Sequence, residues 1–208
     1  MAGNDGNDTV VGSAGDDSLF GGDGEDVLLG GHGNDSLAGQ GGNDLLLGGD
    51  GPDKLNGASG SDTLKGGDGN DRLLGGGGHD DLSGDNGRDF LNGSAGWDTM
   101  TGGADDDRLL GGSGRDRMKG ADGNDKLLGH GGADTLFGGK GNDRLKGGSG
   151  HDQLVGEDGD DRFNVGWGTN YIYCGDGDDL IVFPKKKKQY TIKRKDNRVN
   201  IRQKDGRR

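Results

Sequence analysis

Cysteine, proline and aromatic residues are all scarce in this 208-residue sequence, and the shortages exclude whole classes of protein. The single cysteine, Cys174, has no partner for an internal disulfide, so a disulfide-stapled fold is excluded. Only 26% of the residues are hydrophobic, and no apolar stretch approaches the length of a membrane-spanning helix. We therefore expect no insertion into a membrane. Glutamate occurs only at Glu25 and Glu157, so the acidity lies in aspartates at particular positions.

Sequence motifs that carry catalysis are missing as well. The chain contains no H-E-x-x-H, no G-x-S-x-G, no phosphate-binding Walker loop and no twelve-residue EF-hand loop. Its four histidines are scattered and do not have the spacing of a zinc site. We therefore expect that the chain is not an enzyme by itself.

Glycine, by contrast, is abundant, with 52 residues, and it is arranged with aspartate in a nine-residue period. Aspartate recurs at every ninth residue from Asp8 to Asp161 without an insertion or a deletion. An apolar residue stands two positions after each aspartate, and a glycine stands five positions before it. A second glycine stands two positions before each aspartate except Asp107, where Asp105 takes its place. The unit is G-x-x-G-x-D-x-U-x, where U is apolar, and we number its positions 1 to 9. A rigid period of this kind indicates one structural unit stacked on itself.

The residue chemistry of the unit indicates a metal site built from oxygen atoms. Glycines allow positive φ angles and sharp turns, which present main-chain carbonyl oxygens, and the aspartate adds a carboxylate. Six to eight oxygen ligands suit calcium, whereas zinc and copper favour nitrogen and sulfur. The three residues after each aspartate predict a short strand with one apolar side chain facing a core.

The unit resembles the RTX (repeats in toxin) calcium-binding family over residues 3 to about 182. Close copies of the family's unit G-G-x-G-x-D-x-U-x stand at 21–29, 30–38, 48–56, 66–74 and 138–146, and other units depart at position 2. The resemblance implies an all-β fold, a right-handed parallel β-roll (a β-solenoid) with two units per coil and about ten coils. It also implies multiple Ca²⁺ ions between loops stacked on the same side.

Two units per coil would sort the aspartates into two rows of calcium ligands. Nine residues in the first row leave at most eight gaps for ions, and ten in the second leave at most nine. Pro52 and Asp105 make the loops of Asp53 and Asp107 the doubtful members of the second row. The first row comprises Asp8, Asp26, Asp44, Asp62, Asp80, Asp98, Asp116, Asp134 and Asp152, and the second comprises Asp17, Asp35, Asp53, Asp71, Asp89, Asp107, Asp125, Asp143, Asp161 and Asp179.

The composition predicts that folding depends on the metal. Each unit buries one apolar side chain but must order nine residues, many of them glycines with high entropy in the unfolded chain. The stacked aspartates also repel one another. We therefore expect a chain that is disordered without calcium and folds on binding it.

The pattern ends in an aromatic segment and a basic tail. Asn170 takes the aspartate register, and Trp167, Tyr171 and Tyr173 predict a cap over the last coil. Residues 185–208 carry +10, from twelve Lys or Arg and two Asp, whereas the other 184 residues carry −22. We divide the chain into a roll, 1–183, and a non-repetitive tail, 184–208, whose alternation of apolar and polar residues predicts a β-hairpin. We expect the tail to pack against the acidic roll, and we expect no nucleic acid as partner, because the roll would repel phosphate.

The resemblance also implies a biological setting. Proteins of this family are typically secreted by bacteria through type I secretion machinery, and we expect an extracellular monomer without a cleaved signal peptide. The expected function is a calcium-binding module that folds on binding many ions and stabilises a secreted protein. Two alternatives stay open: the C-terminal part of a secreted enzyme or toxin, such as a protease or lipase, or a calcium-dependent structural or adhesive surface protein.

Overall fold

A strand begins directly after almost every repeat aspartate. The computed structural model describes residues 1–183, 190–195 and 198–203. Most strands have six residues, covering positions 7 to 9 of one unit and 1 to 3 of the next. The prediction of three-residue strands was therefore too short. The reason is that parallel pairing continues through the glycine positions, so that Gly22 of β3 (Ser18–Asp23) pairs with Gln40 of β5 (Ser36–Gly41).

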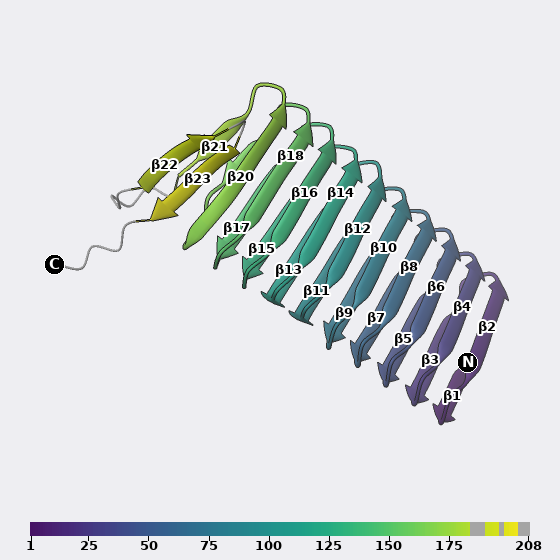
Figure 1. Ribbon diagram of the computed structural model, residues 1–208. Helices are drawn as coiled ribbons and strands as arrows, with labels where there is room; N and C mark the ends of the chain where they lie inside the picture. The colour runs from purple at the N-terminus through teal and green to yellow at the C-terminus, as the bar shows by residue number, and fades with distance from the viewer. Residues whose placement is uncertain (184–189, 196–197, 204–208) are drawn as a thin grey trace.

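Alternate strands belong to alternate sheets, and neighbouring strands of the roll are parallel and in register (Figure 1). Sheet 1 contains β1 (Ala2–Asp5), β3, β5, β7 (Lys54–Ser59), β9 (Arg72–Gly77), β11 (Phe90–Gly96), β13 (Arg108–Gly114), β15 (Lys126–Gly131), β17 (Arg144–Ser149), β19 (Arg162–Asn164) and β21 (Leu180–Val182). Sheet 2 contains β2 (Thr9–Ala14), β4 (Val27–His32), β6 (Leu45–Asp50), β8 (Thr63–Asp68), β10 (Asp81–Asn86), β12 (Thr99–Ala104), β14 (Arg117–Asp122), β16 (Thr135–Lys140), β18 (Gln153–Asp158), β20 (Thr169–Asp176), β23 (Arg198–Gln203) and β22 (Tyr190–Lys195).

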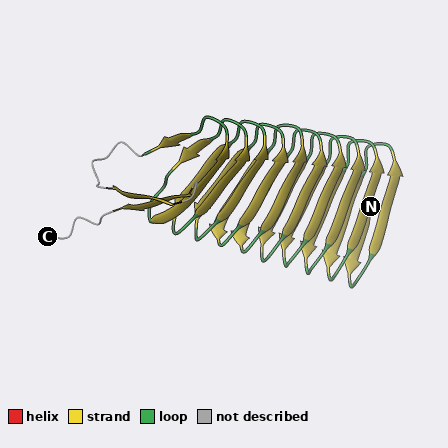
Figure 2. Ribbon diagram, turned by 45° about the horizontal axis from the view of Figure 1, so that its top comes forward, coloured by secondary structure: helices red, strands yellow, loops and turns green. Residues whose placement is uncertain are grey.

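The core is a single column of position-8 side chains enclosed by the two sheets. Each coil adds one such residue from each sheet, from Leu19 to Phe163, and almost all of them are fully buried. Short loops join the sheets along both sides of the roll (Figure 2). This is the β-solenoid of about ten coils that the resemblance to the RTX family implied. In the part of the chain that the structure describes, no helix has the length and apolarity to cross a bilayer.

The C-terminal strands extend sheet 2. β23 pairs antiparallel with β20, and β22 pairs antiparallel with β23, as the alternation of the tail predicted. Residues 196 and 197, between these strands, lie outside the described residues. The division into a roll, 1–183, and a separate tail, 184–208, stays a prediction. The predicted aromatic cap stays a prediction: Trp167 and Tyr171 are 47% and 39% exposed, and Val165 and Ile172 are buried in the core beside them.

Candidate metal centres

Each loop holds positions 4 to 6 of a unit and therefore one repeat aspartate. The loops that leave sheet 1, beginning with the one that contains Asp8, form what we name the first loop edge. Those that leave sheet 2, beginning with the one that contains Asp17, form the second loop edge. The two edges lie on opposite sides of the roll (Figure 2). Because successive units alternate between the two edges, the aspartates lie in two rows, as expected.

Within each row the aspartates form a continuous hydrogen-bonded ladder. The backbone N–H of Asp26, for example, donates to Oδ1 of Asp44 in the next coil at 2.9 Å. The same bond, between 2.7 and 3.2 Å, recurs from coil to coil along both edges. Asn170 ends the first ladder by accepting the N–H of Asp152, and Asp179 ends the second by accepting the N–H of Asp161. The sequence predicted the rows, but not the donors that hold Oδ1.

The other carboxylate oxygen, Oδ2, is buried in all eighteen repeat aspartates from Asp8 to Asp161, with no hydrogen-bond partner among the described residues. Burying an unpaired carboxylate oxygen is costly. A Cβ placed on Gly12 would lie 2.6 Å from Oδ2 of Asp17 and 2.6 Å from the carbonyl oxygen of Gly30 in the next coil. A carboxylate oxygen and a main-chain oxygen thus converge on a space that only glycine leaves open.

Glycine is therefore needed for two different reasons. At positions 2 and 4 the backbone turns with positive φ, for example 128° at Gly22 and 137° at Gly24. Position-1 glycines such as Gly12 do not have positive φ, and Oδ2 of the aspartate occupies the place of their missing side chain. The prediction that all these glycines serve to turn the backbone is therefore correct only for positions 2 and 4. Residues that replace glycine at position 2 also have positive φ, for example 78° at Ala58.

Burial raises the pKa of the ladder carboxyls. Burial is the largest cause throughout, the hydrogen bond from the amide of the preceding coil opposes it, and neighbouring carboxylates raise the pKa further. On the first loop edge the pKa rises to about 6 at Asp44, Asp80, Asp98, Asp116, Asp134 and Asp152. On the second it rises to about 6 at Asp53, Asp125 and Asp161, about 7 at Asp89 and Asp143, and about 8 at Asp107.

The two loops with irregular sequences keep their place in the second ladder. Despite Pro52, Oδ1 of Asp53 accepts the N–H of Asp35 at 2.7 Å. Asp107 donates and accepts the regular ladder bonds at 2.8 Å, and Asp105 takes the positive φ, 72°, of the glycine it replaces. The hydrogen bonds therefore show no disturbance at either loop.

A second, outer ladder formed by position-5 side chains was not anticipated. Oδ1 of Asn43 accepts the N–H of Ser61 at 2.7 Å. In the same way Nδ1 of His79 accepts the N–H of Trp97 at 2.9 Å, and the two rings stack with centroids 5.4 Å apart. The signal available in the sequence was the frequency of Asn, Asp and His at position 5.

Oxygen atoms are the donors that these loops supply. Within the described ranges no three His, Cys, Asp or Glu side chains cluster so that they could hold a metal ion by themselves, so main-chain oxygens would have to complete any site. A metal ion here would contact one carboxylate oxygen per loop together with main-chain carbonyl oxygens. This donor set fits Ca²⁺, which takes six to eight oxygen ligands in flexible geometry. The buried Oδ2 atoms, which have no hydrogen-bond partner among the described residues, are the carboxylate oxygens that remain for such an ion.

Comparison with known families agrees with this donor set. A family model described as the RTX calcium-binding nonapeptide repeat matches the chain eight times. The matches cover residues 2–37, 24–55, 38–73, 47–82, 56–91, 74–109, 110–145 and 146–181, so together they span nearly the whole roll. The comparison with curated proteins gave no match.

Proposed function

Because the chain belongs to the RTX calcium-binding nonapeptide repeat family, we propose that its two aspartate ladders bind rows of calcium ions and that the chain folds on binding them. The ligands are Oδ2 of the ladder aspartates and the main-chain oxygens around position 1. In the folded roll Oδ1 accepts the amide of the preceding coil, so each carboxylate has Oδ2 left for an ion. The family membership supports calcium as the ion, and the residues are our assignment.

The proposal depends on the two rows of buried Oδ2 atoms, which have no hydrogen-bond partner among the described residues. Residues 1–184 have a net charge of −22, and the ladder brings their carboxylates together in register. Repulsion between them and the cost of burial oppose folding unless a cation balances the charge. Binding free energy for calcium would then be folding free energy.

We place this module in a secreted bacterial protein, whose folding and stability it serves. Low calcium inside the cell would keep the chain unfolded for a type I secretion machinery. Extracellular modules commonly bind calcium with dissociation constants of about 10⁻⁴ to 10⁻³ M. Affinities in this range would let the roll fold only after export.

The test is a calcium titration of the full chain followed by far-ultraviolet circular dichroism, with the bound ions counted by equilibrium dialysis. We expect a cooperative transition from coil to β structure, many ions bound per chain, and no such transition with magnesium. Excess chelator should reverse it. A chain that keeps its β structure in chelator at pH 8, where the ladder carboxyls are largely charged, would contradict folding on binding.

A matched pair of variants separates the ladders from other acidic groups. Replacing Asp80, Asp98 and Asp116 with Asn keeps the Oδ1 acceptor, as Asn170 does naturally, but removes three Oδ2 ligands. The control replaces the exposed Asp50, Asp68 and Asp122 with Asn and removes the same charge. We expect fewer bound ions only in the first variant. Equal losses in both would mean that calcium screens charge without occupying the ladder.

A further inference from the structure

The outer faces of the two sheets differ sharply in charge. From β5 to β19, the strands of sheet 1 contain no aspartate or glutamate at all. The strands of sheet 2 over the same length carry acidic residues, among them Asp50, Asp68, Asp81 and Asp158. The sheet 1 strands from β7 to β19 contain seven Lys and Arg residues, which is more than half of the thirteen in residues 1–184. A chain that is acidic as a whole therefore has one basic sheet face.

Six of these cations lie in a single row at position 7, one on each strand except β11. The strand register pairs them directly, Lys54 with Arg72, Arg108 with Lys126, and Arg144 with Arg162. All six side chains are exposed, and none has an ion pair with a described residue. We name Lys54, Arg72, Arg108, Lys126, Arg144 and Arg162 the cationic row.

Phe90 fills the gap in the row and orders its neighbours. The guanidinium groups of Arg72 and Arg108 lie over the Phe90 ring, 4.5 and 5.5 Å from its centroid. These contacts hold the two arginines on the sheet while leaving them exposed. Neighbouring strands are about 4.8 Å apart, so the row is roughly 30 Å long. It is an array of positive charges on successive strands, interrupted at Phe90.

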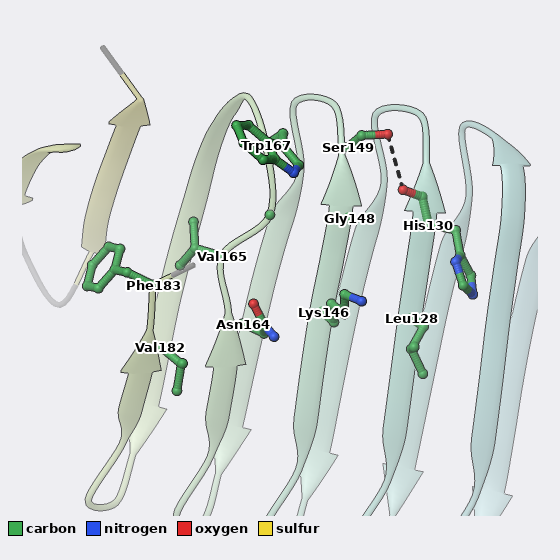
Figure 3. A pocket seen from close by; sticks show the side chains of 11 residues that line it. Leu128, His130, Lys146, Gly148, Ser149, Asn164, Val165, Trp167, Val182 and Phe183 are labelled. Atoms are coloured by element: carbon green, nitrogen blue, oxygen red, sulfur yellow. Dashed lines mark hydrogen bonds between the residues drawn. The ribbon is translucent and has the colours of Figure 1, made fainter. Parts of the chain in front are cut away.

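At the C-terminal end the row leads into a groove of about 480 Å³ on the same face. Leu128, Lys146, Asn164 and Val182 lie side by side on successive strands along it, and Trp167 lies at the adjoining loop (Figure 3). These strand residues occupy position 9, two residues after the cationic row and therefore on the same side of the sheet. The groove offers a cation, an amide and an indole beside the row.

We propose that the outer face of sheet 1 binds a linear acidic polysaccharide lying along the roll. Its carboxylate or sulfate groups contact the cationic row, because guanidinium groups bind such planar or multidentate oxyanions well. Asn56, Asn92 and Asn164, in the neighbouring position-9 row, face the same side and can hydrogen-bond sugar hydroxyls. Trp167 provides an apolar surface for a sugar ring in the groove.

The surroundings of the row favour a narrow polymer over other anionic partners. Each residue of the cationic row directly follows an aspartate of the second ladder, so the row adjoins the second loop edge. This edge also carries acidic residues outside the ladder, among them Asp50, Asp68, Asp106 and Asp122. A flat anionic membrane or a double helix would also meet these acidic residues. A single-stranded nucleic acid needs aromatic platforms for successive bases, whereas the one aromatic residue within the row, Phe90, is covered by arginines.

The test measures binding of the full chain, in calcium, to an immobilised chondroitin sulfate fragment by biolayer interferometry. Arg72→Gln, Arg108→Gln and Arg144→Gln together remove three charges from the row. The matched control, Lys65→Gln, Arg117→Gln and Lys119→Gln, removes three from the opposite sheet. Circular dichroism in calcium confirms folding of both variants. We expect at least tenfold weaker binding for the row variant and less than a twofold change for the control.

A second pair of variants tests the groove. Trp167→Ala should weaken binding at least threefold, whereas Trp97→Ala, at another exposed tryptophan outside the groove, should not. Equal effects of the two triple variants, or no binding by the folded wild-type chain, would overturn the proposal. Tighter binding to an oligothymidine or to phosphatidylglycerol vesicles than to chondroitin sulfate would overturn the assigned partner class. Neutral dextran should not bind.

Discussion

The two loop edges share one backbone but differ in charge. Both have the same ladder of amide-to-Oδ1 bonds and the same buried Oδ2 atoms. From residue 40 onward, positions 2 to 5 of the units whose aspartates lie on the first loop edge contain one charged residue, Arg115, apart from histidines. The corresponding positions of the second loop edge contain many acidic residues, including Asp85, Asp105 and Glu157. The repeat therefore fixes the geometry of a site, and its variable positions tune the site's electrostatics.

The consequence appears in the carboxyl pKa values. On the first loop edge the raised pKa of Asp98 is about 6, with burial as the main cause. On the second, burial combines with the charges of Asp89, Asp125 and Asp105 to raise the pKa of Asp107 to about 8. Near neutral pH the second loop edge therefore retains protons that the first has lost. A cation at the second loop edge must displace those protons but meets a stronger negative field.

The largest expected difference is in the pH dependence of the calcium-free chain. A carboxyl whose folded pKa lies above its unfolded value, about 3.9, binds more protons when folded, so its stabilising effect is present below pH 4 and is lost as the pH rises through the folded pKa. We expect more β structure at pH 4 than at pH 8, measured by circular dichroism in chelator.

Variants of the ladder aspartates show how much each loop edge contributes to the loss of β structure as the pH rises. Asp89→Asn, Asp107→Asn and Asp143→Asn together should remove the pH dependence between about pH 6 and 8, because their pKa values are about 7, 8 and 7. The same replacements at Asp80, Asp98 and Asp116 should leave that range unchanged. Identical pH profiles for both variants would refute the difference between the edges.

Single replacements in calcium should have a smaller effect. Asp98→Asn and Asp107→Asn each keep Oδ1 but lose an Oδ2 ligand, and we expect each to lower the free energy of unfolding by roughly 1–3 kcal/mol at pH 8. At pH 6.5 the cost of Asp107→Asn should shrink, because calcium must there displace a proton from the wild-type carboxyl, whose pKa in the metal-free chain is about 8. Urea unfolding at a fixed calcium concentration, at pH 8 and at pH 6.5, measures the free energy of unfolding of both variants. A cost for Asp107→Asn that is independent of pH would contradict the raised pKa.

Restoring the repeat glycine at residue 105 should stabilise the second loop edge. Asp105 has a φ of 72°, a conformation that costs a side-chain-bearing residue about 1–2 kcal/mol, and its charge raises the pKa of Asp107. Asp105→Gly should therefore raise the free energy of unfolding and move the pH transition of Asp107 downward. The control, Asp106→Asn, removes the neighbouring charge without changing a strained residue. It should stabilise less.

The smallest expected effect is one that should be equal on the two edges. Ala58 precedes the first loop edge and Ala121 the second, and both have positive φ, 78° and 91°. Replacing either with Gly relieves strain but adds entropy to the unfolded chain, so we expect a gain of at most about 1 kcal/mol. Thermal unfolding in calcium should give similar values for both. A clear difference would mean that the two backbones are not equivalent.

Much of the ladder site was predictable because its period is rigid. The two units per coil implied by the family resemblance predicted that aspartates such as Asp26 and Asp44 stack, and the apolar position two residues later predicted the core. Strand length was underestimated, because the pairing of Gly22 with Gln40 depends on a neighbouring coil. The role of the position-1 glycine was also missed, since it follows from where Oδ2 lies and not from turning.

The sequence by itself determined that the units stack and that their loops offer oxygen atoms, because a nine-residue period with one apolar residue per unit can bury its core only by stacking. Its resemblance to the RTX family implied the two rows of aspartates. Only the tertiary structure decided which carboxylate oxygen is held and which is unpaired, because the amide that binds Oδ1 belongs to a residue eighteen positions earlier. It also decided that Lys54, Arg72 and their counterparts form one row. Residues scattered along the chain become neighbours only when every second unit returns to the same sheet.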